Sequence, residues 1–302
     1  MKKLNLKSST VNNIVGWSFA FPAIFGFLAF NLVPMLMSAY YSLCEYSIIG
    51  TPEFIGLENY KMLFSGEMKT FWISARVTAL YAIMAVPANL CFAFFIAILL
   101  NRDMIGRAFF RSLFYLPCIL PGVASSFVWI LLMNPEFGLF NTILELLHLP
   151  TSLFFWGKNS VLPSIVFMGI WSTGSTQVIF LAGLQDIPRV YYEALEIDGG
   201  NAWHKFWKVT LPMISPTLFF NLVTGIIGAL QVFGSAYVIT EGGPNNSSLF
   251  FVYELWRQAF TYMDMGVASA MAWVLFVVVL ILTVFVFTTS KKWVYYEGGD
   301  ES

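Results

Sequence analysis

Charged residues are scarce in this chain, and that scarcity limits what the protein can be. Only 11% of the 302 residues are charged, whereas 58% are hydrophobic, and the formal net charge is −1. The mean hydropathy is +0.73. A soluble domain of this size cannot bury so much apolar surface, but a helical membrane protein exposes it to lipid. A nearly neutral chain also lacks the basic surface that a nucleic-acid partner would need.

Several chemical motifs are missing as well. The sequence holds no GxxxxGK[ST] phosphate loop, so the chain does not bind ATP by that route. Its cysteines, Cys44, Cys91 and Cys118, lie far apart in apolar contexts typical of small hydrophobic residues inside helices. The histidines, His148 and His204, lie in different loops, and no metal-ligand cluster or nucleophile–base pair is evident. We therefore expect no enzyme, no metal site and no cofactor in this chain.

Long apolar segments predict an all-α membrane protein with six transmembrane helices in a single domain, residues 1–302. The expected spans are about 14–43, 71–100, 109–133, 161–184, 213–239 and 265–289. Their interiors hold no Asp, Glu, Lys or His at mid-depth, whereas ion-coupled carriers usually keep an ionisable group or an unwound helix there. If the protein transports against a gradient, we expect the work to come from another subunit.

The basic residues predict an orientation. Eleven of the sixteen Lys and Arg residues fall in the N-terminal region and the loops on its side, and five fall in the opposite loops. Because cytoplasmic loops carry an excess of Lys and Arg, we expect both termini and the 186–212 loop in the cytoplasm. The expected location is therefore a cell membrane, crossed several times, with lipid around the spans.

The stretch from Tyr192 to Pro212 is a polar segment between two apolar runs. Its charged and titratable residues are Glu193, Glu196, Asp198, His204, Lys205 and Lys208. The pattern is helical up to Asp198, is broken by Gly199-Gly200, and becomes helical again with Trp203, Phe206, Trp207 and Val209 on one side. It predicts two short helices at the membrane surface with an aromatic face available for docking.

Polar and small residues form stripes on three expected spans. The fifth carries Asn221, Thr224, Gly225, Gly228, Gln231 and Ser235; the fourth carries Met168, Trp171, Ser172 and Ser175, with Gln177 nearby; and the second carries Thr78, Tyr81, Ala85 and Asn89. Such residues also let membrane helices pack and hydrogen-bond, so each one alone has a purely structural interpretation. As a set, amides, hydroxyls and aromatic rings suit a polyhydroxylated ligand such as a sugar. We expect Asn89, Trp171, Ser172, Ser175, Gln177, Asn221, Thr224, Gly228 and Gln231 to line the substrate path.

The polar segment resembles the EAA loop of binding-protein-dependent ABC importer permeases. That pattern is EAA, three residues, Gly, nine residues, then I-x-L-P; here Glu193, Ala194 and Leu195 are followed by Gly199 and, nine residues later, by Val209, Thr210, Leu211 and Pro212. Leu195 replaces the second Ala and Val209 replaces Ile, and both changes keep an apolar side chain. The resemblance implies that Glu193, Ala194, Asp198, Gly199, Trp203, Phe206, Leu211 and Pro212 couple the chain to an ATPase. Glu193 would be an ionic anchor, Gly199 a turn, and Trp203 and Phe206 apolar docking surface; Asp198 is equally explained as ordinary helix-end chemistry.

Most of the chain is also similar to the carbohydrate subfamily, the maltose and glycerol-phosphate type, and in particular to its first permease subunit. The supporting segments are FIGLENYKMLF, FFRSLFYLPCILPGVASSFVWILLMNPEFGLFN, FLAGLQDIPRVYYEA and VITEGGPNNSS. The resemblance implies a type I importer architecture in a bacterial inner membrane. It also implies a second permease, two copies of a cytoplasmic ABC ATPase that binds ATP and Mg, and an extracytoplasmic solute-binding protein. The EGGPNNSS turn resembles the family loop that approaches the binding protein.

The sequence therefore predicts half of the translocation path of an ATP-driven importer for a sugar or oligosaccharide. A second hypothesis is a secondary carrier or facilitator for a small polar solute that needs no ATPase. A third is a membrane scaffold that only recruits soluble partners, which would leave the polar stripes unexplained. Neither the solute nor the partner ATPase is identified by the sequence, and a phosphorylated glycerol remains possible although no basic residue lies in the stripes.

Overall fold

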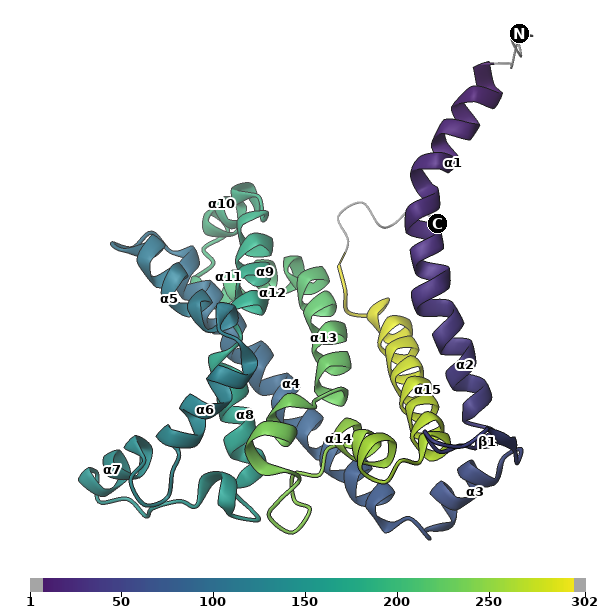
Figure 1. Ribbon diagram of the computed structural model, residues 1–302. Coiled ribbons are helices and arrows are strands. Elements are labelled where there is room, and N and C mark those ends of the chain that lie inside the picture. The colour runs from purple at the N-terminus through teal and green to yellow at the C-terminus, as the bar shows by residue number, and fades with distance from the viewer. Residues whose placement is uncertain (1–7, 296–302) are drawn as a thin grey trace. The chain divides into compact units, whose positions relative to one another are not determined.

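The structure is a computed structural model, and it describes residues 8–295, with side chains from residue 15 onward. The N-terminal lysines Lys2, Lys3 and Lys7 lie outside the described residues. The described chain is almost entirely helical, with one small hairpin (Figure 1). It divides into two compact units, one of residues 1–67 and 256–274 and the other of residues 68–255 and 275–302. Each unit is described by itself below.

The first unit begins with a long apolar helical stretch. It consists of α1 (Ser8–Phe27), a wide π-helical turn (Leu28–Leu32) and α2 (Val33–Tyr41). The π turn lies just before Pro34, whose missing N–H and bulky ring disturb a regular helix at this point. The disturbance near Pro34 therefore takes the form of a local widening within a continuous helix.

The segment after α2 is short and irregular, as its turn-rich sequence indicates. Strands β1 (Cys44–Glu45) and β2 (Glu53–Phe54) form an antiparallel pair, and α3 (Glu58–Ser65) follows. The buried Asn59 side chain donates hydrogen bonds to the carbonyl oxygens of Ser42 and Cys44, at 3.0 and 2.9 Å. These bonds hold α3 against the end of α2. The π-helical segment Arg257–Thr261 also belongs to this unit.

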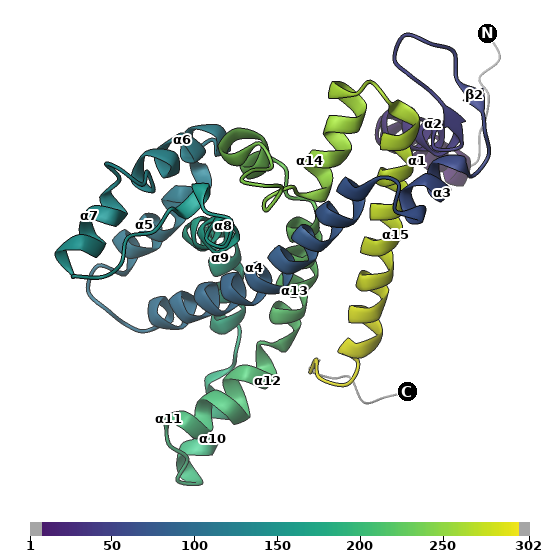
Figure 2. The same ribbon diagram turned by 90° about the horizontal axis from the view of Figure 1, so that it is seen from below.

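The second unit is organised around α4 (Lys69–Asn101), which packs along α8 (Val161–Trp171), α9 (Gly174–Gln185) and α13 (Ser215–Leu230). Figure 2 shows α4 crossing this group of helices. The core lies where α4 meets α9. Ala93 and Ala97 are fully buried on α4 and sit one turn apart, which lets the backbone of α9 approach, and Phe180 of α9 fills the space beside them.

The remaining elements of this unit lie around that group. They are α5 (Arg107–Ile119), α6 (Gly122–Leu132), α7 (Leu139–Leu146), the 3₁₀ turn Phe154–Trp156, α10 (Arg189–Ile197), α11 (Ala202–Lys205), the π turn Phe206–Thr210, α12 (Leu211–Met213), the π turn Ala236–Thr240 and α14 (Phe251–Trp256). The last long helix, α15 (Met265–Ser290), contributes its first ten residues to the first unit and the rest to the second.

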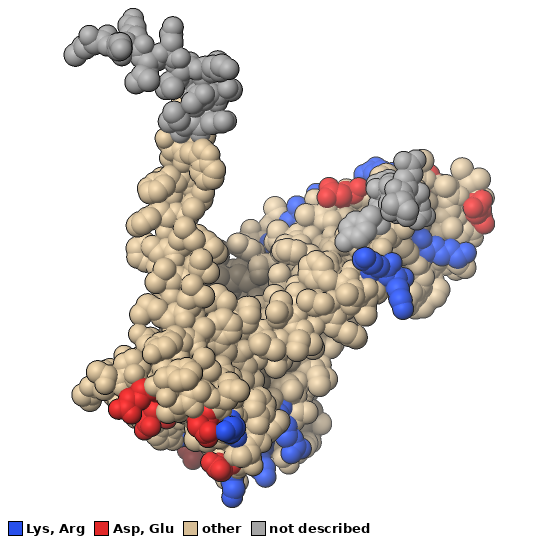
Figure 3. Space-filling model, turned by 90° about the vertical axis from the view of Figure 1, so that its right-hand side faces the viewer, with Lys and Arg blue, Asp and Glu red and all other residues tan. Residues whose placement is uncertain are grey.

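Three described helices are long and apolar enough to cross a bilayer: Val15–Tyr41, Lys69–Asn101 and Met265–Ser290. These match the expected spans 14–43, 71–100 and 265–289. Figure 3 shows a face of the molecule on which uncharged side chains form most of the surface. A largely uncharged helical surface of this kind suits the hydrocarbon interior of a bilayer.

The other three expected spans are not single straight helices. The segment 109–133 is the pair α5 and α6, bent by 101°, and the segment 161–184 is the pair α8 and α9, bent by 50°. The segment 213–239 is not one helix either, because α13 ends at Leu230. The axis of α13 makes an angle of 62° with that of the preceding helical stretch, Ala202–Met213. Six spans are reached only if each bent pair counts as one span.

Candidate functional site

The polar loop folds as two short helices joined by a tight turn. Helix α10 ends at Ile197 with Asp198 as its C-cap, and Gly199 then adopts a positive φ of 79°. The N–H groups of Gly199 and Gly200 donate to the carbonyl oxygens of Glu196 and Leu195, at 3.0 and 2.8 Å. A left-handed glycine with backbone bonds back to the last turn is a standard way to end a helix. The turn that the two glycines predict is therefore present.

The second helix of the loop has its own start signal. The Asn201 side chain accepts a hydrogen bond from the backbone N–H of His204 at 3.0 Å, and the His204 ring contacts the backbone N–H of Asn201 in return. This reciprocal arrangement is a capping box, which satisfies N–H groups that a helix start leaves unpaired. Asn201 is thus a structural determinant of the loop that the sequence pattern alone did not identify.

Side chains tie the two arms of the loop together. Lys205 of α11 forms an ion pair with Glu196 of α10. The hydroxyl groups of Tyr192 and Thr210 lie 3.1 Å apart and share a hydrogen bond. The loop is therefore a defined helical hairpin and not a flexible connection, and both views show α10 and α11 together at one end of the second unit (Figures 1 and 2).

The hairpin has an outward and an inward side. Glu193, Ala194 and Asp198 are exposed, and Trp203 is 68% exposed. Phe206 instead turns inward, with its ring centroid 6.2 Å from that of Phe94 on α4. Leu211 and Pro212 are half-buried at the junction with α13. The hairpin thus offers exposed groups to a partner while one of its aromatic rings contacts the longest helix of the unit.

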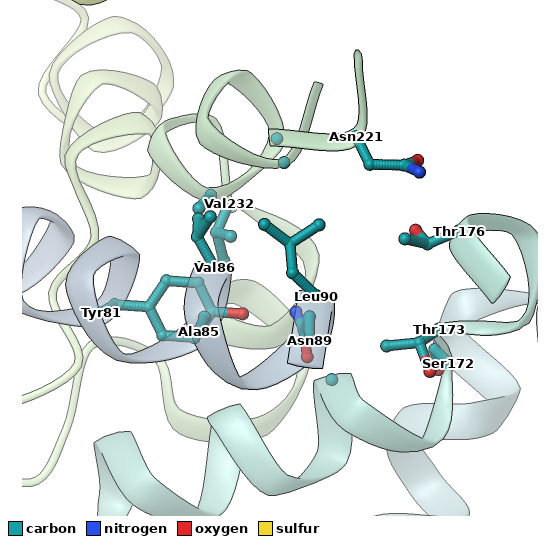
Figure 4. Close-up of a pocket in the computed structure, with 14 residues that line it drawn as sticks. Tyr81, Ala85, Val86, Asn89, Leu90, Ser172, Thr173, Thr176, Asn221 and Val232 are labelled. Atoms are coloured by element: carbon teal, nitrogen blue, oxygen red, sulfur yellow. The ribbon is translucent and has the colours of Figure 1, made fainter. Parts of the chain in front are cut away.

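A polar cavity of about 220 Å³ lies between the helices of the second unit. Its lining comes from α4, from α13 and from the junction of α8 and α9, as Figure 4 shows. The polar and small lining residues are Tyr81, Ala85, Asn89, Gly169, Ser172, Thr173, Thr176, Asn221, Gly225 and Gly228. Of the described residues that line the cavity, none is charged. A neutral, hydrogen-bonding ligand therefore suits it better than an ion.

Two amide groups in this cavity lack hydrogen-bond partners. The side-chain oxygen of Asn89 and the side-chain nitrogen of Asn221 are buried and unpaired among the residues that the structure describes. Asn221 is 98% buried, being only 2% exposed. A buried polar group without a partner costs free energy, so such groups in a cavity are normally satisfied by water or a ligand. One acceptor and one donor, on different helices, are thus available to a bound molecule.

The structure brings only some of the expected path residues to this cavity. Asn89, Ser172, Asn221 and Gly228 line it, whereas Trp171, Ser175, Gln177, Thr224 and Gln231 do not. Trp171 packs against Trp129 with ring centroids 5.6 Å apart, and Gln177 is buried inside the helix packing. The Thr224 hydroxyl donates to the carbonyl of Phe220 on its own helix.

Thr173 and Thr176 line the cavity but are missing from the expected path. Together with Gly169 and Ser172 they form one helical face, at i, i+3, i+4 and i+7. The expected face of Met168, Trp171, Ser172 and Ser175 is displaced from it by one residue. Gln231 lies just beyond the end of α13, and the neighbouring Val232 lines the cavity instead.

A bundle of apolar helices that surrounds a cavity lined by uncharged residues and carries an exposed helical hairpin suits a membrane transport subunit. A family model, described as binding-protein-dependent transport system inner membrane component, matches residues 89–294. The chain is 41% identical to the probable ABC transporter permease YesP of Bacillus subtilis over 98% of this chain and 96% of that protein. It is 32% identical to the trehalose/maltose permease MalF of Thermococcus litoralis, covering 89% of this chain and 91% of that one.

The fold agrees with these similarities. A chain in the crystal structure of a bacterial alginate ABC transporter, in complex with its alginate-bound periplasmic protein, superposes with a TM-score of 0.82 and 20% identity. The match covers 94% of this chain and 96% of that one. The chain belongs to the family of binding-protein-dependent transport system inner membrane components. It is a multi-pass permease subunit of the inner membrane, as its sequence predicts.

Proposed function

We propose that this permease forms half of the translocation path of an ATP-driven importer for a neutral sugar or oligosaccharide. The observation that carries the proposal is the uncharged cavity with the unpaired amides of Asn89 and Asn221. Sugar hydroxyls both donate and accept hydrogen bonds, so one ligand satisfies an amide oxygen and an amide nitrogen together. The relatives support the solute class, since the MalF protein is named for trehalose and maltose.

The proposal extends to the partners of the chain. A second permease would complete the path, and two copies of a cytoplasmic ATPase would bind ATP and Mg and dock on the 186–212 loop. A solute-binding protein would deliver the sugar from the other side, and both termini would lie in the cytoplasm. The exposed Glu193 and Trp203 support this assignment for the hairpin, and its contact with α4 through Phe206 gives a route for movement to reach the cavity.

The neutral lining bears on the class of sugar. Anionic ligands such as a phosphorylated glycerol or an acidic polysaccharide are normally met by Arg or Lys. Among the described residues that line the cavity no such side chain occurs. This favours an uncharged solute, unless a basic residue of the second permease completes the site.

The first test is a mild-detergent purification of the tagged full-length chain, with the co-purifying proteins identified by mass spectrometry. We expect an ATPase and a second permease. The variant Glu193→Lys should lose the ATPase and retain the second permease. Glu136→Lys, which reverses an equally exposed charge in a loop outside the hairpin, is the matched control and should keep both.

Transport by the purified complex in liposomes then separates the two functional hypotheses. Uptake that requires ATP and the binding protein supports the importer. Uptake by this chain alone, with or without an ion gradient, would instead establish a carrier. Normal ATP-dependent transport by Glu193→Lys would rule out an anchoring role for that carboxylate.

A further inference from the structure

The short helix α7 has three different faces, and their arrangement identifies what surrounds it. In the sequence it follows the bent pair α5–α6 and precedes the bent pair α8–α9, and in Figure 1 it lies at the opposite end of the second unit from α10. Eight residues make slightly more than two turns, so each face is formed by only a few side chains, and Leu147, the C-cap, adds one more. The faces are a packing face, an apolar exposed face and a polar exposed face.

The packing face fixes α7 to its own chain. The ring of Phe140 stacks on Trp129 of α6, with centroids 5.7 Å apart and planes inclined by 7°. Asn141 is buried, donates to the carbonyl oxygens of Pro135 and Ser152 at 2.9 Å each, and accepts from the N–H of Ser152 at 3.0 Å. These contacts fix the rotation of the helix about its axis. The directions in which its other faces point are therefore fixed as well.

The apolar face is exposed in this setting. Leu139, Ile143, Leu146 and Leu147 follow one another at i, i+4, i+7 and i+8, and Leu146 is 76% exposed. The exposed Glu145 lies roughly opposite Ile143 on the helical wheel, and Thr142 lies between the two edges. The helix thus has one face that packs against the protein, one exposed face of four aliphatic residues, and one exposed polar face.

We propose that α7 lies flat in the bilayer interface, on the membrane surface away from the 186–212 hairpin, with its aliphatic face among the lipid chains. A helix in the interface buries an apolar face in the acyl boundary and keeps a polar face in water. A helix at the rim of a membrane protein needs a third face for the protein itself. The three faces of α7 match these three surroundings.

Two observations favour lipid over a protein partner. The face consists of Leu and Ile only, whereas the energetic centres of protein interfaces are enriched in Trp, Tyr and Arg. The same kind of surface also continues along α6, where Phe127 and Leu131 are 58% and 60% exposed. The pair α5–α6 is together long and apolar enough to cross a bilayer, so the exposed apolar side chains of α6 suit lipid, and α7 would extend that surface into the interface.

Depth-dependent quenching tests the proposal. An environment-sensitive fluorescent amino acid is placed at position 146 or, as the matched control on the same helix, at position 145 of the full-length chain. Each protein is reconstituted in nanodiscs of phosphatidylcholine and phosphatidylglycerol, alone and as the purified complex. Brominated forms of these lipids quench from the acyl region, and iodide quenches from water.

We expect strong quenching at position 146 by the brominated lipids and little by iodide, with the opposite pattern at position 145. Quenching of position 146 by iodide would overturn the proposal, because the aliphatic face would then be in water. Protection of position 146 from both quenchers, in the chain alone or in the complex, would also overturn it and would indicate that protein covers the face. Equal behaviour of the two positions would also overturn it, because α7 would then have no fixed rotation at the membrane.

Discussion

The hydroxyl oxygen of Thr78 accepts a hydrogen bond of 2.8 Å from the backbone N–H of Phe251. The bond is buried and joins α4 to the start of α14, across 173 residues of sequence. Thr78 belongs to the stripe of polar and small residues on the second expected span, yet its side chain joins two helices by a hydrogen bond. The nearby rings of Phe71 and Phe251, whose centroids lie 5.6 Å apart, pack beside this bond.

Thr78→Val keeps the shape of the side chain but removes the acceptor. The N–H of Phe251 would then be buried without a partner, which costs about 1–3 kcal/mol. We expect a lower midpoint of thermal unfolding in detergent, measured for the purified complex. Thr78→Ser keeps the hydroxyl and should stay close to the original protein. An unchanged midpoint for Thr78→Val would mean that this bond contributes nothing to stability.

Asn221→Leu tests the cavity. The substitution removes the unpaired amide and places an aliphatic side chain in the polar space, so the ligand loses a hydrogen-bond partner. One such bond corresponds to roughly a fivefold or greater loss of sugar uptake. Thr224→Val is the control on the same helix, because the Thr224 hydroxyl bonds to its own backbone and does not line the cavity. Equal effects of the two variants on uptake would argue against the cavity as the sugar site.

Gly200→Ala tests the turn of the hairpin. A Cβ atom at this position would lie 2.6 Å from Cγ of Leu195 and 2.8 Å from its carbonyl oxygen. Relief of such overlap typically costs about 1–3 kcal/mol and would move the two arms apart. We expect weaker recovery of the ATPase during purification. Gly122→Ala, whose Cβ would meet no atom within 4 Å, should behave like the original chain.

Variants of Trp203 and Phe206 distinguish binding of the ATPase from transmission of movement between the hairpin and α4. Trp203→Ala removes an exposed ring and should weaken binding of the ATPase. Phe206→Ala removes the contact with Phe94 of α4, so the ATPase should still bind while sugar uptake per ATP hydrolysed falls. The measurement is a comparison of ATPase recovery, ATP hydrolysis and uptake for the two variants. Loss of ATPase binding in both variants to the same extent would mean that the two aromatic residues act as one docking surface.

The sequence predicts helix positions well where the apolar pattern is long. It predicts a turn well where the conformational preference of a single residue determines the backbone. The helix expected over 71–100 is observed at Lys69–Asn101, and the helix expected over 265–289 at Met265–Ser290. Gly199 indicates the turn of the hairpin because only a residue without a side chain enters the left-handed region freely.

The breaks in the other helices are harder to predict from the sequence. Pro121 forces the preceding Leu120 into an extended conformation, so that the signal for the bend between α5 and α6 was present in the sequence. No proline marks the bend at Ser172–Thr173 or the end of α13 at Leu230. The assignment of cavity residues depends on helical phase, and the face expected on the fourth span differs by one residue from the face that lines the cavity, which carries Gly169, Ser172, Thr173 and Thr176.

The bends also have a mechanical consequence. A continuous helix resists bending because its hydrogen-bond ladder has to be broken first, whereas at Leu120–Pro121, Ser172–Thr173 and Ile214 regular helix is already interrupted. Rotation at these points breaks fewer helical hydrogen bonds than bending within α4 or α13. Ser172–Thr173 directly precedes α9, and Ile214 lies between the hairpin and α13, and both α9 and α13 carry residues that line the cavity. A displacement of the hairpin would therefore reach the cavity as rotation of α13 as a whole, with its internal geometry preserved.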